Sequence, residues 1–110
     1  MNLIPLTDEA GLEEIKKLSA EKPQVIFKHS TRCSISSMAK NRLERVIAPE
    51  AADFHYLDLL QHRALSGKIA EDFHVEHESP QILVIRNGQC IYDESHSGIH
   101  MHEIEKQIGN

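Results

Sequence analysis

Residues 24–37 read QVIFKHSTRCSISS, an apolar run that leads into a polar segment holding one of the two cysteines of the chain. The run Val25-Ile26-Phe27 is rich in β-branched and aromatic residues, which is typical of a buried strand. Beyond Cys33, apolar residues recur at helical spacing and stop before Pro49, which predicts a helix over residues 35–47. Cys33 is therefore expected at the junction between a strand and a helix.

That junction would favour a reactive sulfur at Cys33. The free N–H groups and the positive dipole end of a first helical turn stabilise a thiolate, and a cysteine placed there typically has its pKa lowered from about 8.5 to roughly 3.5–7.5. Arg32, Lys28 and a protonated His29 would add positive potential, and Ser36 would supply a capping hydroxyl. The spacing alone leaves open the alternative that Cys33 is a small buried packing residue.

The rest of the chain alternates between helical and strand patterns. Thr7 is the expected N-cap of a first helix, and Asn87-Gly88 is a strong signal for a two-residue hairpin. The expected elements are a helix over 8–20, strands over 24–29 and 54–58, a helix over 61–73, hairpin strands over 82–85 and 90–93, a C-terminal helix carrying Met101, Ile104 and Ile108, and possibly a short leading strand at Leu3-Ile4-Pro5. This order predicts one α/β domain over residues 1–110, with a central mixed sheet of about four strands flanked by helices.

Composition narrows the function classes. The chain has 110 residues, of which 40% are apolar and 26% charged, with a net charge of -5. These values are typical of a folded globular domain. No basic stripe indicates a nucleic-acid partner, no apolar run approaches the length of a membrane span, and no signal peptide is visible at the start. The cytoplasm is the expected compartment, since two cysteines do not make a disulfide scaffold.

Three motifs together resemble a known family. They are residues 27–36, which read FKHSTRCSIS, the later Glu78-Ser79-Pro80-Gln81, and Arg86-Asn87-Gly88. They are similar to the thioredoxin superfamily, and more narrowly to the YtxJ-type monothiol bacilliredoxins of the bacillithiol system. The pattern of that family around the cysteine is Lys-His-Ser-Thr-x-Cys-Pro-Ile-Ser, and this chain departs from it at Ser34, which stands where proline is usual. The resemblance extends over essentially the whole chain.

The resemblance implies a thioredoxin-like fold, with an extra N-terminal helix, and a function in thiol chemistry. Cys33 would be the nucleophile that removes a low-molecular-weight thiol, bacillithiol in that family, from S-thiolated client proteins. Ser79 and a cis Pro80 would line the substrate groove opposite Cys33. Ser36 replaces the second cysteine of dithiol enzymes, so no internal dithiol couple is expected, and no tightly bound cofactor is implied.

Two other function classes stay open at this point. One is a non-catalytic thioredoxin-fold adaptor or stress protein in which Cys33 is incidental. The other is a monothiol glutaredoxin-like cluster carrier, which is disfavoured because Ser34-Ile35 stands where such carriers have Gly-Phe.

The second cysteine and the histidines have less specific patterns. Cys90 is expected to be a packing residue that does not pair with Cys33, because the hairpin end and the active-site end of a strand of five to six residues are roughly 17–20 Å apart. The eight histidines include the pair His74 and His77 and the group His96, His100 and His102. They lack the converging spacing of a zinc site, so surface histidines are expected and no metal site is predicted.

Overall fold

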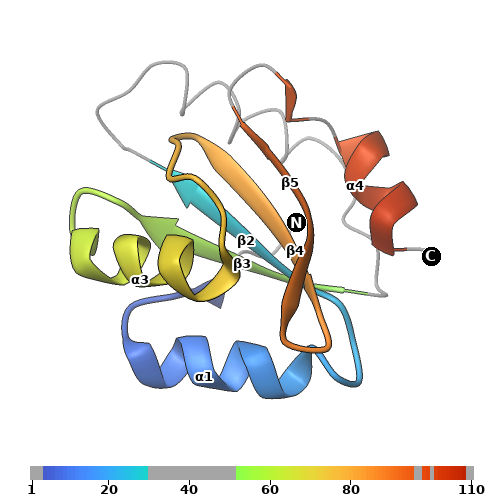
Figure 1. Ribbon diagram of the computed structural model, residues 1–110, viewed down its shortest axis with the longest axis horizontal. Helices are drawn as coiled ribbons and strands as arrows, with labels where there is room; N and C mark the ends of the chain where they lie inside the picture. Colours follow the sequence, from blue (N-terminus) through green and yellow to red (C-terminus); the bar gives the residue numbers. More distant parts are fainter. Residues whose placement is uncertain (1–3, 30–51, 96–97, 100, 109–110) are drawn as a thin grey trace.

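The central sheet contains five strands in the order β1-β3-β2-β4-β5 (Figure 1). The computed structural model describes residues 4–29, 52–95, 98–99 and 101–108. The strands are β1 (Ile4–Pro5), β2 (Gln24–His29), β3 (Asp53–Asp58), β4 (Gln81–Arg86) and β5 (Gln89–Ser95). Strands β1, β3 and β2 run parallel, whereas β4 and β5 are antiparallel to their neighbours. The expected sheet of about four strands therefore has five, because the short leading strand pairs with β3.

Three helices pack on this sheet within the described residues: α1 (Glu9–Leu18), α3 (Arg63–Phe73) and α4 (Met101–Ile108). The expectation that Thr7 caps α1 is wrong. Asp8 is the N-cap, and its Oδ1 accepts a hydrogen bond of 2.8 Å from the Gly11 N–H. An aspartate in this position also brings a negative charge to the positive end of the helix dipole. The helix expected over residues 35–47 lies outside the described residues.

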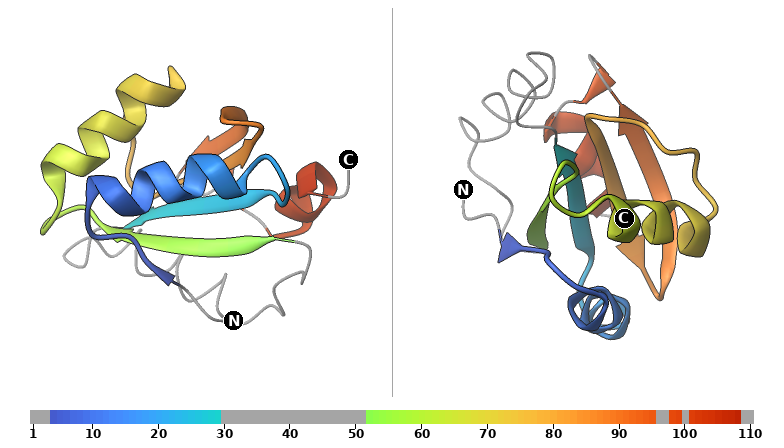
Figure 2. Two further views of the ribbon diagram at one scale, coloured as in Figure 1. Left: turned by 90° about the horizontal axis from the view of Figure 1, so that it is seen from below. Right: turned by 90° about the vertical axis from the view of Figure 1, so that its left-hand side faces the viewer.

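The sheet separates two hydrophobic clusters. One face packs against α4 (Figure 2), with a cluster made of Val25, Phe27, Ala52, Phe54, Ile82, Val84, Ile99, Ile104 and Ile108. The opposite face packs against α1 and α3, with a cluster made of Leu6, Leu12, Ile15, Ile26, Leu57, Leu65, Ile69, Phe73, Leu83 and Ile85. Successive side chains of β2 and β4 alternate between the two clusters, as a strand requires. Both strands are consequently buried on both faces, which explains why their sequences read as continuous apolar runs.

The hairpin between β4 and β5 has the predicted two-residue turn. Asn87 and Gly88 both have positive φ, at 52° and 74°, which is the backbone that a type I′ turn requires. The two turn residues donate backbone hydrogen bonds of 2.9 Å to Ser19, one to its carbonyl and one to its hydroxyl. The turn is therefore held against the end of α1.

A bulge interrupts the pairing of β5 with β4. Val84 pairs with Tyr92 and Ile85 with Cys90, so Ile91 is an extra residue in β5. The bulge leaves Ile91 exposed, and it places Tyr92 and Cys90 against opposite faces of the sheet.

Candidate active site

The predicted nucleophile Cys33, together with Arg32 and Ser36, lies outside the described residues. Their roles therefore stay predictions from the sequence. The described residues include the strand that leads into this segment, the groove residues Ser79 and Pro80, and α3 with the loop that follows it.

The end of β2 lies beside the predicted groove residues. Lys28 pairs with Gln81 across the β2–β4 ladder, so Pro80 directly precedes the last paired position. The Ser79–Pro80 peptide bond is cis, as the resemblance implied, and the Pro80 side chain is buried. Pro80 stands just before β4 rather than inside it. The β2–β4 pairing thus brings Lys28 and Gln81, which are far apart in the sequence, together at the end of the strand that leads to Cys33.

Lys28 is a lysine whose side chain has no exposed surface. Its Nζ donates to the backbone oxygen of Ser66 at 3.2 Å and to Nδ1 of His77 at 3.3 Å, and the Ser66 Oγ lies 3.2 Å from the same imidazole nitrogen. Burial lowers the pKa of Lys28 to about 8, because a low-dielectric surrounding disfavours the ammonium. Lys28, which is predicted to support Cys33, is therefore a buried cation between β2 and α3, with His77 as a direct contact.

His77 is exposed, as expected for a surface histidine, but it also has a specific contact. Partial burial and then the nearby Lys28 ammonium lower its pKa below the ordinary value. The lowered pKa favours the neutral imidazole, whose Nδ1 accepts a hydrogen bond from Lys28 Nζ. No sequence pattern predicts this pairing, since Ser66 and His77 lie 38 and 49 residues from Lys28.

His29 follows Lys28 but faces the opposite side of the sheet. Its buried ring stacks on Phe27, with centroids 5.8 Å apart, and is tilted against Tyr56 at 5.6 Å. Lys28 and His29 were both predicted to support Cys33. Because neighbouring side chains alternate along β2, Lys28 and His29 would act on Cys33 from opposite faces of the sheet.

A shallow hollow of about 240 Å³ lies at this edge of the sheet, lined by Leu59, Arg63, Gly67 and His77. The Leu59 N–H donates to the carbonyl oxygen of His29 at 2.8 Å. The hollow therefore lies where β2 and β3 end side by side, which is the edge where open α/β sheets generally bind ligands.

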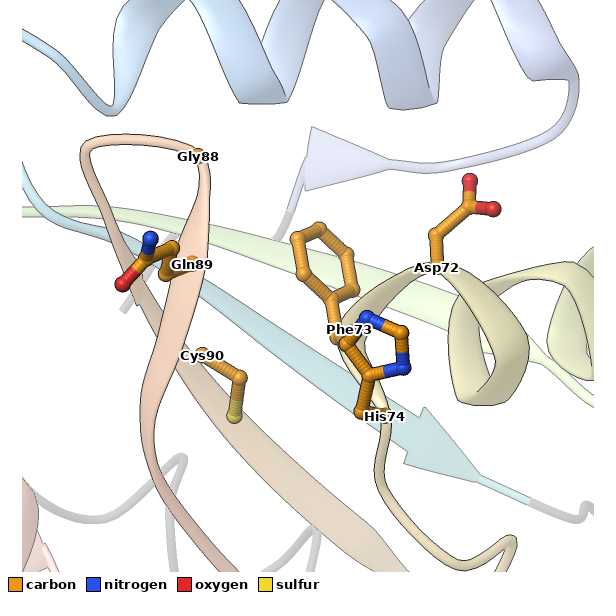
Figure 3. Close-up of a pocket in the computed structure, with 6 residues that line it drawn as sticks. All are labelled: Asp72, Phe73, His74, Gly88, Gln89 and Cys90. Carbon is orange, nitrogen blue, oxygen red and sulfur yellow. The ribbon is translucent and has the colours of Figure 1, made fainter.

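A second hollow, of about 320 Å³, lies near the turn of the β4–β5 hairpin (Figure 3). Figure 3 shows Cys90 on β5 across from Phe73 and His74 at the end of α3. Cys90 is half-buried and packs on the α1 and α3 cluster beside Ile85, in agreement with a packing role. Burial raises the pKa of the Cys90 thiol to about 11, and its Sγ donates to the Tyr92 carbonyl at 3.3 Å. Cys90 therefore stays a protonated thiol at neutral pH.

The described part of the chain holds neither a cluster of metal-ligating side chains nor a helix of membrane-spanning character. Over residues 4–29, 52–95, 98–99 and 101–108, no three His, Cys, Asp or Glu side chains are placed to hold a metal ion together. Over the same residues, no helix has both the length and the apolar character needed to cross a bilayer. His96 and His100 lie outside the described residues.

Comparison with known proteins assigns the family. The profile of the family described as monothiol bacilliredoxin BrxC matches residues 4–104. The chain belongs to the monothiol bacilliredoxin family. Among solved structures, this bacilliredoxin is similar to a protein described as a candidate oxidoreductase with a thioredoxin fold, at 29% identity and a TM-score of 0.83, covering 94% of this chain and 91% of that one.

Two thioredoxins share the fold of this bacilliredoxin. The thioredoxin of Malassezia sympodialis is 16% identical, with a TM-score of 0.73, and the match covers 98% of this chain and 89% of that one. The thioredoxin of Fasciola hepatica is 17% identical, again with a TM-score of 0.73, and the match covers 97% of both chains. The predicted thioredoxin-like fold is therefore confirmed, and the family supports a thiol redox protein.

Proposed function

We propose that this bacilliredoxin is a monothiol thiol–disulfide oxidoreductase that removes a low-molecular-weight thiol, with bacillithiol as the leading candidate, from mixed disulfides with client proteins. The observation that carries the proposal is the family match over residues 4–104, which includes Cys33. The sequence adds that Ser36 stands where a dithiol enzyme has its second cysteine. In the reducing cytoplasm, where we place the reaction, such a protein would need no resident cofactor.

In the proposed reaction, the Cys33 thiolate attacks the sulfur of the small thiol in the mixed disulfide. The bond between the client sulfur and the small thiol breaks, and a new disulfide joins Cys33 to the small thiol. The client cysteine leaves as a thiolate and takes a proton from solvent. One disulfide is exchanged for another, so no external oxidant or reductant is consumed in this step. A second thiol must then release the adduct from Cys33.

The surrounding residues have distinct proposed roles. Arg32 and the backbone N–H groups near Ser36 would stabilise the Cys33 thiolate, since a thiolate is favoured by positive potential and by N–H donors. Lys28 would add the positive potential of a buried cation. His29 would support the residues that follow β2 through its stacking on Phe27. Ser79 and Pro80 would form the groove wall at the end of β2.

The proposal is tested by release of a client from its mixed disulfide. A client protein with one cysteine, carrying bacillithiol, glutathione or coenzyme A, is incubated with the wild-type chain and with Cys33→Ser. We expect the free client to appear only with the wild type, and fastest from one of the three adducts. Equal release by Cys33→Ser, or no release from any adduct, would reject the proposal and favour the non-catalytic alternative.

A further inference from the structure

The hollow lined by Leu59, Arg63, Gly67 and His77 has one formally charged side chain, Arg63, among its described lining residues. Across the described ranges, the Arg63 guanidinium makes no ion pair or hydrogen bond. Lys68, one turn further along the same helix, is instead neutralised by Asp72 at 3.0 Å. Arg63 is therefore a cation at the rim of a hollow with its donors available to a ligand.

A second cation lies behind the wall of the hollow. The Lys28 ammonium is held by a carbonyl oxygen and by the neutral His77 ring, and its contacts in the described residues include no carboxylate. Its charge is therefore only partly compensated. The two acidic residues that are next to lining residues in the sequence, Asp58 and Glu78, do not themselves line the hollow. Asp58 accepts the Leu60 N–H at 3.0 Å, and Glu78 acts on His77 from a position that does not line the hollow.

Gly67 forms an open part of the wall. A Cβ atom built on Gly67 would have no neighbour within 4 Å, so this position in the middle of α3 leaves room for a ligand that a larger side chain would fill. The hollow, at about 240 Å³, is smaller than a typical site for a drug-sized ligand and suits a fragment of a small molecule.

We propose that this hollow is an anion subsite that binds a carboxylate of the low-molecular-weight thiol, with Arg63 as the direct partner and Lys28 acting through His77. This inference rests on the proposed function and deepens it, because it assigns the substrate an anionic group. The location supports it, since Leu59 is hydrogen-bonded to His29, four residues before Cys33. The subsite would hold the small thiol by its charged end while its sulfur reaches the nucleophile.

The test uses one client protein carrying three small thiols of different charge. Mercaptosuccinate is anionic, 2-mercaptoethanol is neutral and cysteamine is cationic. The rate of adduct transfer to the chain is measured by intact mass for the wild type, Arg63→Gln, Gly67→Leu and the control Lys68→Gln. Lys68→Gln also removes one positive charge from α3, but that charge is already paired with Asp72 and is therefore a matched control.

We expect Arg63→Gln to slow transfer of mercaptosuccinate about tenfold, the loss typical of one charge-assisted hydrogen bond. Transfer of 2-mercaptoethanol should change less than about twofold, and Lys68→Gln should leave both rates near those of the wild type. Gly67→Leu should also slow transfer of mercaptosuccinate more than transfer of the other two adducts, because the leucine side chain fills the subsite. Leucine is a good helix former, so α3 should be retained.

The outcomes separate the two proposals. If transfer occurs but Arg63→Gln and Lys68→Gln affect the three adducts alike, the anion subsite is overturned and the proposed function stands. If no adduct reaches the wild-type chain, the proposed function itself fails. Circular dichroism of each variant shows whether the fold is retained, and Gly67→Leu supplies an independent probe of the hollow if Arg63→Gln is unstable.

Discussion

Lys28 is a charged residue that folding removes completely from solvent. The free-energy cost of burying an ammonium is reduced by its two acceptors, Ser66 and His77, but the cost is visible in a pKa lowered to about 8. Retaining a lysine where an apolar side chain would pack is consistent with a role for its charge at the end of β2 rather than with a role in stability.

Replacing Lys28 with Met should stabilise the protein at neutral pH, and the gain should shrink as the pH rises. The folded-state pKa of about 8 is below the unfolded value of 10.5, so the buried charge opposes folding fully below pH 8. Between pH 8 and 10.5 the unfolded chain binds more protons, and the wild type gains stability with pH. We expect the stability difference between Lys28→Met and wild type to fall by about 2 kcal/mol from pH 7 to pH 9.5.

Urea unfolding of both proteins at the two pH values measures this difference, because titrating groups remote from Lys28 cancel in the comparison and the pKa of its neighbour His77 lies below its ordinary value of 6.5, outside the pH range used. A difference that does not change with pH would mean that Lys28 is not a buried charge.

Cys90 should react slowly with alkylating agents. Its pKa of about 11 leaves very little thiolate at pH 8, and half of the side chain is covered. In the Cys33→Ser variant, where Cys90 is the remaining cysteine, iodoacetamide labelling at pH 8 should be slow until the protein is unfolded in urea. Rapid labelling of the folded variant would contradict the packing role of Cys90.

At the scale of the elements, local sequence patterns were enough for most of the fold. The hairpin was predictable because Asn-Gly encodes positive φ at both turn residues, and the buried strands were predictable from their continuous apolar runs. The N-cap was missed because Thr7 and Asp8 are adjacent residues with similar capping propensity, and only the backbone geometry distinguishes them.

Two glycine substitutions separate backbone strain from packing. Added Cβ atoms at Gly88 and Gly67 would both have open space, but Gly88 has a φ of 74° whereas Gly67 lies in the interior of α3. Gly88→Ala should therefore destabilise the protein by about 1–2 kcal/mol. Gly67→Ala should stabilise it by roughly 0.5–1 kcal/mol through helix propensity.

The free energies of unfolding in urea compare these two variants with the wild type. If Gly88→Ala is as stable as the wild type, the positive φ at Gly88 is not what the turn requires.

At the scale of the whole molecule, the sheet is shared by two cores. Ile82 and Leu83 are neighbours on β4, fully buried, and face opposite clusters. Truncating either side chain to Ala should cost about 2–5 kcal/mol, because each change leaves a cavity in a closely packed interior.

The same shared sheet predicts that the two cores unfold together. For Ile82→Ala and for Leu83→Ala, urea transitions followed by circular dichroism should coincide with those followed by the fluorescence of Tyr56 and Tyr92, which pack on the α4 face. Separate transitions in either variant would show that the two faces are independent units.

The site depends on contacts that sequence patterns do not reveal. The resemblance to a family was enough to propose Cys33, Ser79 and Pro80, because their motifs are contiguous in the chain. The roles of Arg63 and His77 were missed since the two residues share one hollow, and His77 contacts Lys28, only in the folded structure. Side-chain clusters built from segments 38 to 49 residues apart need the three-dimensional structure.

In the proposed function, Cys33 accepts the small thiol from the client. The most direct measurement is intact mass followed by peptide mapping of the wild-type chain, after stoichiometric incubation with a client carrying bacillithiol. We expect a mass increase of one bacillithiol adduct on the peptide that contains Cys33, an unmodified Cys90, and one equivalent of free client. An adduct on Cys90, or free client with no adduct on Cys33, would show that Cys33 is not the acceptor.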